Sequence, residues 1–101
     1  MANHLDAAVD NSPKQYRDAP KNQLNVLVYA PFRTYFNGLA NSVTAKNGKG
    51  VFDILPLHHS FITLLDPGHV TIRSEQGEQK IEIDKGLMHV NLNQVTVFLD
   101  V

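Results

Sequence analysis

The chain has 101 residues, a length that fits one domain and is too short for two. Its formal net charge of −1, with basic residues scattered along the chain, argues against nucleic acid as the main partner, because neutralising phosphates requires clustered Lys and Arg. The absence of cysteine excludes disulfides and thiolate sites, and no apolar run approaches the ~20 residues of a membrane helix, so we expect no direct membrane insertion.

Residues 1–23 mix charges, amides and prolines, and their few apolar residues follow no sustained period. A segment of this composition buries too little apolar surface to offset the entropy that it loses on ordering. We therefore predict a flexible polar tail over residues 1–23 and one folded domain over residues 24–101. An arm that becomes ordered on a partner is the alternative interpretation of this tail.

From Leu24 onward, short runs with a period of two alternate with turn residues, which is typical of β-strands. The clearest runs are LNVLVYA (24–30), HVTIRS (69–74), QKIEID (79–84), LMHVNL (87–92) and QVTVFLDV (94–101). Between two other runs, Asn47-Gly48 is typical of a type I′ hairpin turn. We predict an all-β fold, an antiparallel β-sandwich or flattened barrel of about eight to ten short strands.

The alternation divides these strands into an inner and an outer face. The inner positions hold Val26, Val28, Val70, Ile72, Ile81, Ile83, Met88, Val90, Val95, Val97 and Leu99. Burying each such side chain is worth ~1.5–3 kcal/mol, so we expect the domain to fold as a monomer without metals or disulfides. Four apolar residues fall on outward positions, namely Leu27, Tyr29, Leu87 and Phe98. If they are neighbours, they form a docking patch, but the sequence does not determine their adjacency.

Patterns for catalysis and metal binding are weak. A cupin-like metal site is one functional alternative, with His58, His59, His69 and His89 as its candidate ligands. The adjacent pair points to opposite faces if it lies on a strand, and the other two occupy outward positions. No nucleophile elbow and no phosphate-binding loop is present. We therefore predict a protein that is not an enzyme and needs no cofactor or metal, with these histidines on the surface or in loops.

The order of the remaining motifs resembles that of a known family. GVFDILPLH (50–58) is followed by FITLLDPGHVTI (61–72), a charged hairpin, IDKGLMHV (83–90) and NQVTVFLDV (93–101). This order is similar to the N-terminal β-sandwich domain of the epsilon subunit of rotary F-type ATP synthases. The most specific element is G-x-F-x-I-L-P-x-H, and the resemblance covers the chain from Leu24 to its end.

The resemblance implies a non-catalytic coupling subunit of the central stalk, peripheral on the cytoplasmic face of the cell membrane. Such a subunit binds the gamma subunit and the ring of c subunits, and it couples proton- or sodium-driven rotation to ATP synthesis. The c-ring contact loop is then expected to include Phe52, Pro56 and His58. The gamma contacts are expected to be Leu27, Tyr29, Leu87 and Phe98. A stand-alone small β-sandwich module that binds a protein or a ligand is the second interpretation.

The sequence departs from the family pattern at three points. Val51 stands where the family usually has an acidic residue, which removes the basis for a charged contact to the ring. Leu57 stands where the family often has glycine; if the position needs a positive φ, the loop is expected to differ, because a Cβ disfavours that conformation. The family commonly continues into two helices that carry its ATP site. This sequence ends at Val101, so we expect no ATP binding, and a naturally short subunit and a shortened chain both remain open.

Overall fold

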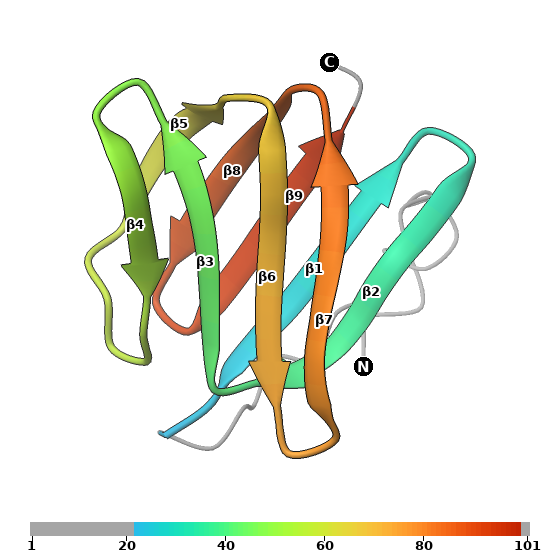
Figure 1. The fold of residues 1–101 in the computed structure, drawn as a ribbon. Helices are drawn as coiled ribbons and strands as arrows, with labels where there is room; N and C mark the ends of the chain where they lie inside the picture. The colour runs from blue at the N-terminus through green and yellow to red at the C-terminus, as the bar shows by residue number, and fades with distance from the viewer. Residues whose placement is uncertain (1–21, 100–101) are drawn as a thin grey trace, which may run out of the picture.

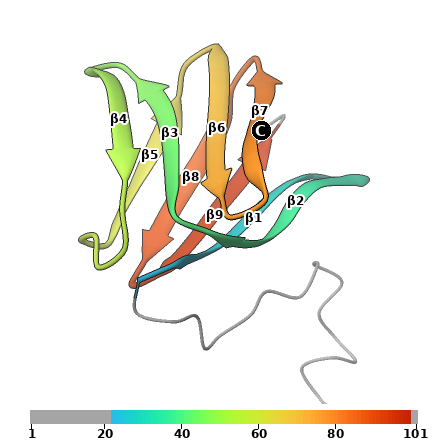
Figure 2. The same ribbon diagram turned by 60° about the horizontal axis from the view of Figure 1, so that its bottom comes forward.

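The computed structural model describes residues 22–99, which form two β-sheets packed face to face (Figures 1 and 2). The strands are β1 (Leu24–Ala30), β2 (Arg33–Ala40), β3 (Ser42–Asn47), β4 (Gly50–Ile54), β5 (Phe61–Leu65), β6 (Gly68–Ser74), β7 (Gly77–Ile83), β8 (Gly86–Asn91) and β9 (Gln94–Leu99). No helix in this part of the chain is long and apolar enough to cross a membrane. The predicted tail, apart from residues 22 and 23, lies outside the described residues.

One sheet has the strand order β2-β1-β9-β8-β5, and the other has the order β4-β3-β6-β7. The predicted β-sandwich is therefore confirmed. One pairing departs from the antiparallel pattern, because β1 and β9 run parallel, with Val26 opposite Val95. This pairing places the first and last strands of the domain side by side in the middle of the larger sheet (Figure 1).

The core lies between the two sheets, as the alternation predicts. Every predicted inner residue is at most 8% exposed. Ile54, from the motif that carries the family resemblance, is fully buried, and Phe52 on the same strand is half-buried against the core. Burial of this kind stabilises a small domain by ~1.5–3 kcal/mol for each large side chain, which makes it the main term that holds the sheets together.

The β3–β4 turn shows that the type I′ prediction is wrong. Asn47 pairs with Gly50 across the turn, and neither Gly48 nor Lys49 has a positive φ, which a type I′ turn needs at both central residues. The backbone N–H of Lys49 instead donates to Asn47 Oδ1 at 2.9 Å. The asparagine side chain offers the backbone a local partner, and the positive φ falls on Gly50, at 120°.

Gly86 begins β8 at a point where β8 and β9 approach each other closely. A Cβ at this residue would lie 3.0 Å from Leu99 Cδ2 and 3.1 Å from the carbonyl oxygen of Phe98. A side chain at this position would therefore require its neighbours to move by a few tenths of an ångström, and the backbone carbonyl moves less easily than the leucine methyl. The close contact between the strands thus favours glycine here.

We expect Gly86→Ala to lower the free energy of unfolding by ~1–3 kcal/mol, because the added methyl group overpacks a buried strand contact. Gly48→Ala is the matched control, since a Cβ there meets no atom within 4 Å. Its effect should stay within about 0.5 kcal/mol. Urea denaturation of both variants measures the difference, and equal effects would contradict the close-contact explanation.

Candidate functional site

Outward apolar residues form a row across the five-stranded sheet. Tyr29 lies opposite Phe98, Phe98 lies opposite Leu87, and Leu87 lies opposite Leu64. Residues paired across strands project from the same face, so these four side chains are neighbours. The rings of Tyr29 and Phe98 have their centroids 5.1 Å apart. We call Tyr29, Phe98, Leu87 and Leu64 the outer apolar row.

Sequence reasoning missed the strongly exposed apolar side chains of this face, Ile62 and Leu64 on β5, which are 63% and 67% exposed. The strand has the sequence FITLL. Its single polar residue, Thr63, suggests that Thr63 faces outward and that Ile62 and Leu64 face the core. In the structure Thr63 pairs with the buried Met88 and accepts a hydrogen bond from Asn47 Nδ2 at 3.1 Å. A local polar partner thus lets the threonine face inward and turns the two aliphatic residues outward.

Leu27 occupies an outer position on β1, opposite Thr96 on β9 and Asn37 on β2. Its side chain is only 4% exposed, so the expectation that it presents apolar surface outward is wrong. Alternation determines the face of a sheet on which a residue lies. Exposure depends also on what surrounds it, and β1 is an internal strand with neighbours on both sides.

The outer face of the four-stranded sheet has a different character. Arg73 Nε lies 3.5 Å from Glu78 Oε1, and Lys80 Nζ lies 3.7 Å from Glu78 Oε2. Arg73 also donates to Thr44 Oγ1 at 2.9 Å, and the Thr44 hydroxyl donates to Asp53 Oδ1. These exposed polar contacts are typical of a solvated face. The two outer faces of the sandwich are thus chemically distinct, one charged and one carrying an apolar row.

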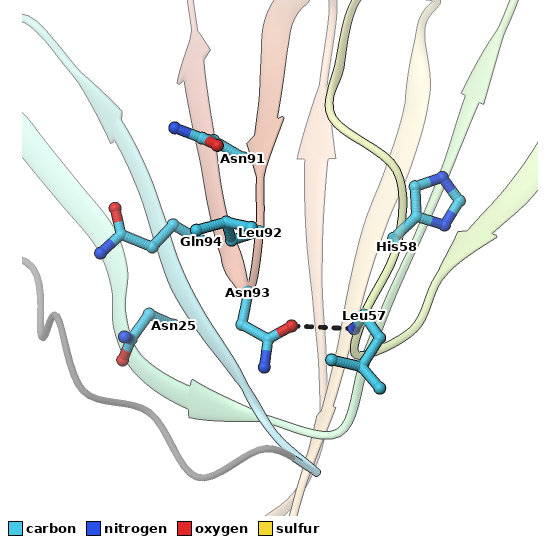
Figure 3. A pocket seen from close by; sticks show the side chains of 7 residues that line it. All are labelled: Asn25, Leu57, His58, Asn91, Leu92, Asn93 and Gln94. Atoms are coloured by element: carbon cyan, nitrogen blue, oxygen red, sulfur yellow. Dashed lines mark hydrogen bonds between the residues drawn. The ribbon is translucent and has the colours of Figure 1, made fainter.

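At one end of the sandwich, the β4–β5 connection lies against the β8–β9 turn. The backbone N–H of Leu57 donates to Asn93 Oδ1 at 2.8 Å (Figure 3). A hollow of about 510 Å³ opens beside this bond, lined by Asn25, Leu57, His58, Asn91, Leu92, Asn93 and Gln94. We call this region, residues 55–60 and 91–94, the end surface.

Leu57 adopts a φ of 68°, so its position in the loop does need the left-handed conformation. The leucine takes this conformation itself. It does so at a cost of ~1–2 kcal/mol, and the hydrogen bond to Asn93 helps to hold it there. Leu92, in the facing turn, also has a positive φ, of 57°.

Two of the three residues predicted for the c-ring contact loop, Phe52 and His58, line one hollow together with Phe61. Phe52 is half-buried between the sheets, with its ring centroid 6.1 Å from that of Phe61. The ring centroid of His58 lies 5.3 Å from the same phenylalanine. Pro56 lies between them in the chain and is half-buried. His58 thus lies between two hollows, the one that it shares with Phe52 and the one of the end surface beside Leu57.

The histidines of the metal-site alternative lie in three separate parts of the fold. His58 and His59 lie in the β4–β5 connection, His69 lies on β6 opposite Glu82, and His89 lies on β8 in the other sheet. Within residues 22–99, no group of three His, Cys, Asp or Glu side chains is placed to hold a metal ion. The described residues thus give the metal-site alternative no support.

Residues 23–101 match the family model described as ATP synthase, delta/epsilon chain, β-sandwich domain. The chain is 31% identical over 77 residues to the ATP synthase epsilon chain of Prochlorococcus marinus (strain MIT 9211), covering 76% of this chain and 57% of that protein. It is 33% identical over 78 residues to the ATP synthase epsilon chain of a Nitratiruptor species, covering 76% of this chain and 60% of that protein. It thus spans less than two thirds of these curated relatives.

Two solved structures share the fold at lower sequence identity. A chain of the Euglena gracilis mitochondrial ATP synthase (OSCP/F1/c-ring, rotational state 1) superposes with a TM-score of 0.75 at 18% identity, covering 92% of this chain and 61% of that chain. A chain of the central stalk and c-ring of the Tetrahymena thermophila mitochondrial ATP synthase superposes with a TM-score of 0.65 at 20% identity, covering 80% of this chain and 66% of that chain.

The left-handed Leu57 generates a stability prediction. We expect Leu57→Gly to raise the free energy of unfolding by about 1 kcal/mol, because glycine adopts a positive φ without the Cβ penalty. Leu57→Ala is the control: it removes the same exposed side chain but keeps the Cβ, so its stability should stay within about 0.5 kcal/mol of the parent. Urea denaturation decides between them, and a glycine variant no more stable than the alanine variant contradicts the prediction.

Proposed function

Because the chain belongs to the ATP synthase delta/epsilon chain β-sandwich family, we propose that it is a non-catalytic central-stalk subunit of an F-type ATP synthase. In this role it binds the gamma subunit and the c ring, peripherally on the cytoplasmic face of the membrane, and couples proton- or sodium-driven rotation to ATP synthesis. The observation that carries the proposal is the outer apolar row, which supplies a docking face to a fold that already belongs to this family.

The gamma contact is assigned to the outer apolar row, which holds three of the residues expected there, Tyr29, Leu87 and Phe98. Aromatic and large apolar side chains dominate the energetics of protein interfaces. Paired aromatic rings provide a rigid contact area and lose little side-chain entropy on binding. The charged outer face of the four-stranded sheet lacks this character. Leu27 is a minor contributor in this assignment, because its side chain is 4% exposed.

The ring contact is assigned to the end surface, which carries Pro56 and His58. This surface lies at the end of the strands, whereas the outer apolar row lies on the face of a sheet. One rigid sandwich can therefore hold two partners at once without either blocking the other. Such a subunit acts mechanically, by keeping a fixed geometry between two gripping surfaces.

A stand-alone ligand-binding module is the second candidate, and the hollow at the end surface favours it. Its volume of about 510 Å³ lies within the range of small-molecule sites, and most of its lining side chains are amides. This interpretation makes the gamma subunit unnecessary for function. A direct binding measurement with the gamma subunit of the same organism distinguishes the two candidates. The central-stalk subunit should bind gamma, and the stand-alone module should not.

We expect Phe98→Ala to weaken gamma binding by ~1–3 kcal/mol, because it removes an aromatic anchor from the outer apolar row. Leu64→Ala should weaken it in the same direction while leaving the fold intact, since this side chain is 67% exposed. Val51→Ala is the matched control, because Val51 is 73% exposed on the charged face. Calorimetric titration with gamma measures all three, and a control that loses as much affinity as Leu64→Ala rules out this face.

We expect His58→Ala to leave gamma affinity within about twofold of the parent chain, because His58 lies away from the outer apolar row. The same variant should associate more weakly with the c ring, as measured by co-sedimentation of the gamma complex with purified rings. The opposite pattern, in which His58→Ala abolishes gamma binding and Phe98→Ala is silent, would show that the two surfaces are exchanged.

A further inference from the structure

The β3–β4 turn contains a chemically labile pair of residues. An asparagine followed by glycine readily loses its side-chain amide, because glycine places no side chain beside the backbone nitrogen that attacks it. The sequence contains two such pairs, Asn37-Gly38 and Asn47-Gly48. The first lies on β2, where pairing with β1 holds the backbone extended. The second spans the end of β3 and the turn that follows it (Figure 1). The fold thus places one reactive pair in a strand and the other in a turn.

The turn leaves the second pair open to reaction. A Cβ built at Gly48 would meet no atom within 4 Å, so the space around this residue is free. Asn47 lines a hollow of about 240 Å³ at the surface, through which water reaches its side chain. The N–H of Lys49 donates to Asn47 Oδ1 at 2.9 Å. This donor points at the oxygen that becomes negatively charged when Cγ is attacked, and such a donor lowers the barrier.

The nitrogen of the same amide is held from the other sheet. Asn47 Nδ2 donates to Thr63 Oγ1 on β5 at 3.1 Å. The Thr63 hydroxyl in turn donates to the carbonyl oxygen of Leu64 at 3.4 Å, so its own oxygen is left to accept from the amide. The amide is therefore fixed at both ends by partners on two different elements. A side chain held in this way cannot rotate freely toward the backbone nitrogen of Gly48.

We propose that Asn47-Gly48 is a deamidation site of this chain and that the hydroxyl of Thr63 restrains the reaction. The backbone nitrogen of Gly48 gives its proton to the solvent and bonds to Asn47 Cγ. The Cγ–Nδ2 bond breaks, and the side-chain nitrogen takes a proton from the solvent and leaves as ammonia. Water then opens the resulting succinimide at either of its two carbonyls, which gives aspartate or isoaspartate. The proposal is independent of a role in an ATP synthase.

The two products have different consequences for the sandwich. Aspartate leaves the main chain of β3 unchanged, and its carboxylate can accept from the N–H of Lys49 and from the hydroxyl of Thr63. Isoaspartate adds a methylene to the main chain at a residue that pairs with Gly50 across the turn, so it disturbs the end of the β3–β4 ladder. Either product brings a negative charge into a hollow that already holds Asp53. The bond to Thr63 thus determines how fast this edge of the domain acquires charge.

The test compares the parent chain with Thr63→Val during incubation at neutral to mildly alkaline pH. Valine keeps the branched shape but lacks the hydroxyl, and the hydrogen bond from Asp66 N to the carbonyl oxygen of Lys46, 2.9 Å long, still joins the end of β5 to β3. We expect Asn47 to lose ammonia roughly fivefold faster in the variant, the factor that corresponds to the loss of one hydrogen bond. Peptide mass spectrometry in water enriched in heavy oxygen measures the rate, because each product takes up one oxygen atom from water.

Two controls identify the reacting pair. Gly48→Ala should lose the modification at Asn47, because the added methyl group shields the attacking nitrogen, and the open space around this residue lets the fold persist. Asn37 is the internal control in every sample. It should stay unmodified in the folded parent chain and in the folded Thr63→Val variant. In the parent chain unfolded by urea, the two pairs should react at similar rates.

Gly86→Ala distinguishes a local effect from a global one. The atoms that a Cβ at Gly86 would meet belong to β9, so this variant loses stability without a change at the amide of Asn47. Its rate of modification at Asn47 should equal that of the parent chain. The proposal is overturned if Thr63→Val reacts no faster than the parent chain, or if Gly86→Ala accelerates the reaction as much. It is also overturned if Asn47 stays intact in both folded chains while the urea-unfolded chain is modified.

Discussion

Side chains alternate between the two faces of every strand, and the burial of one face between the sheets dictates what the other face presents. In β8 and β9, the fully buried Met88 and Val97 direct Leu87 and Phe98 to the opposite side of the sheet. A register slip of one residue would exchange the two sets and expose the core. The position of the outer apolar row is therefore maintained by the whole free energy of core burial, although the row itself contributes little to it.

The same alternation of side chains explains which parts of the molecule could be predicted from its sequence. β8 and β9 were predictable because polar and apolar residues alternate along them. β5 was not, because its only polar residue, Thr63, faces the core beside the side chain of Asn47, which lies 16 positions away in the chain. The parallel pairing of β1 with β9 was also out of reach, since strand partners are chosen by the packing of the complete sandwich. The family motif located the end surface, but it did not show that Leu57 would itself take the left-handed conformation.

Asn93 connects three pieces of the end surface. Its side chain accepts the N–H of Leu57, while its backbone carbonyl accepts the N–H of Asn25 at 2.7 Å. One residue thus joins the β4–β5 connection, the β8–β9 turn and the beginning of β1. Local sequence gives no signal for such a bridge, because its partners are distant in the chain and meet only after both sheets have formed.

The β8–β9 hairpin carries parts of both proposed binding surfaces. Its two arms hold Leu87 and Phe98, and its tip holds Leu92 and Asn93. β9 is flanked by β1 and β8 by β5, so the hairpin is bonded to neighbouring strands on both sides. A force applied at the tip therefore travels along the strand axes and loads rows of backbone hydrogen bonds in shear, where many of them must break together. The hairpin is therefore anchored along both of its edges, and its tip cannot shift along the strands without breaking these bonds together.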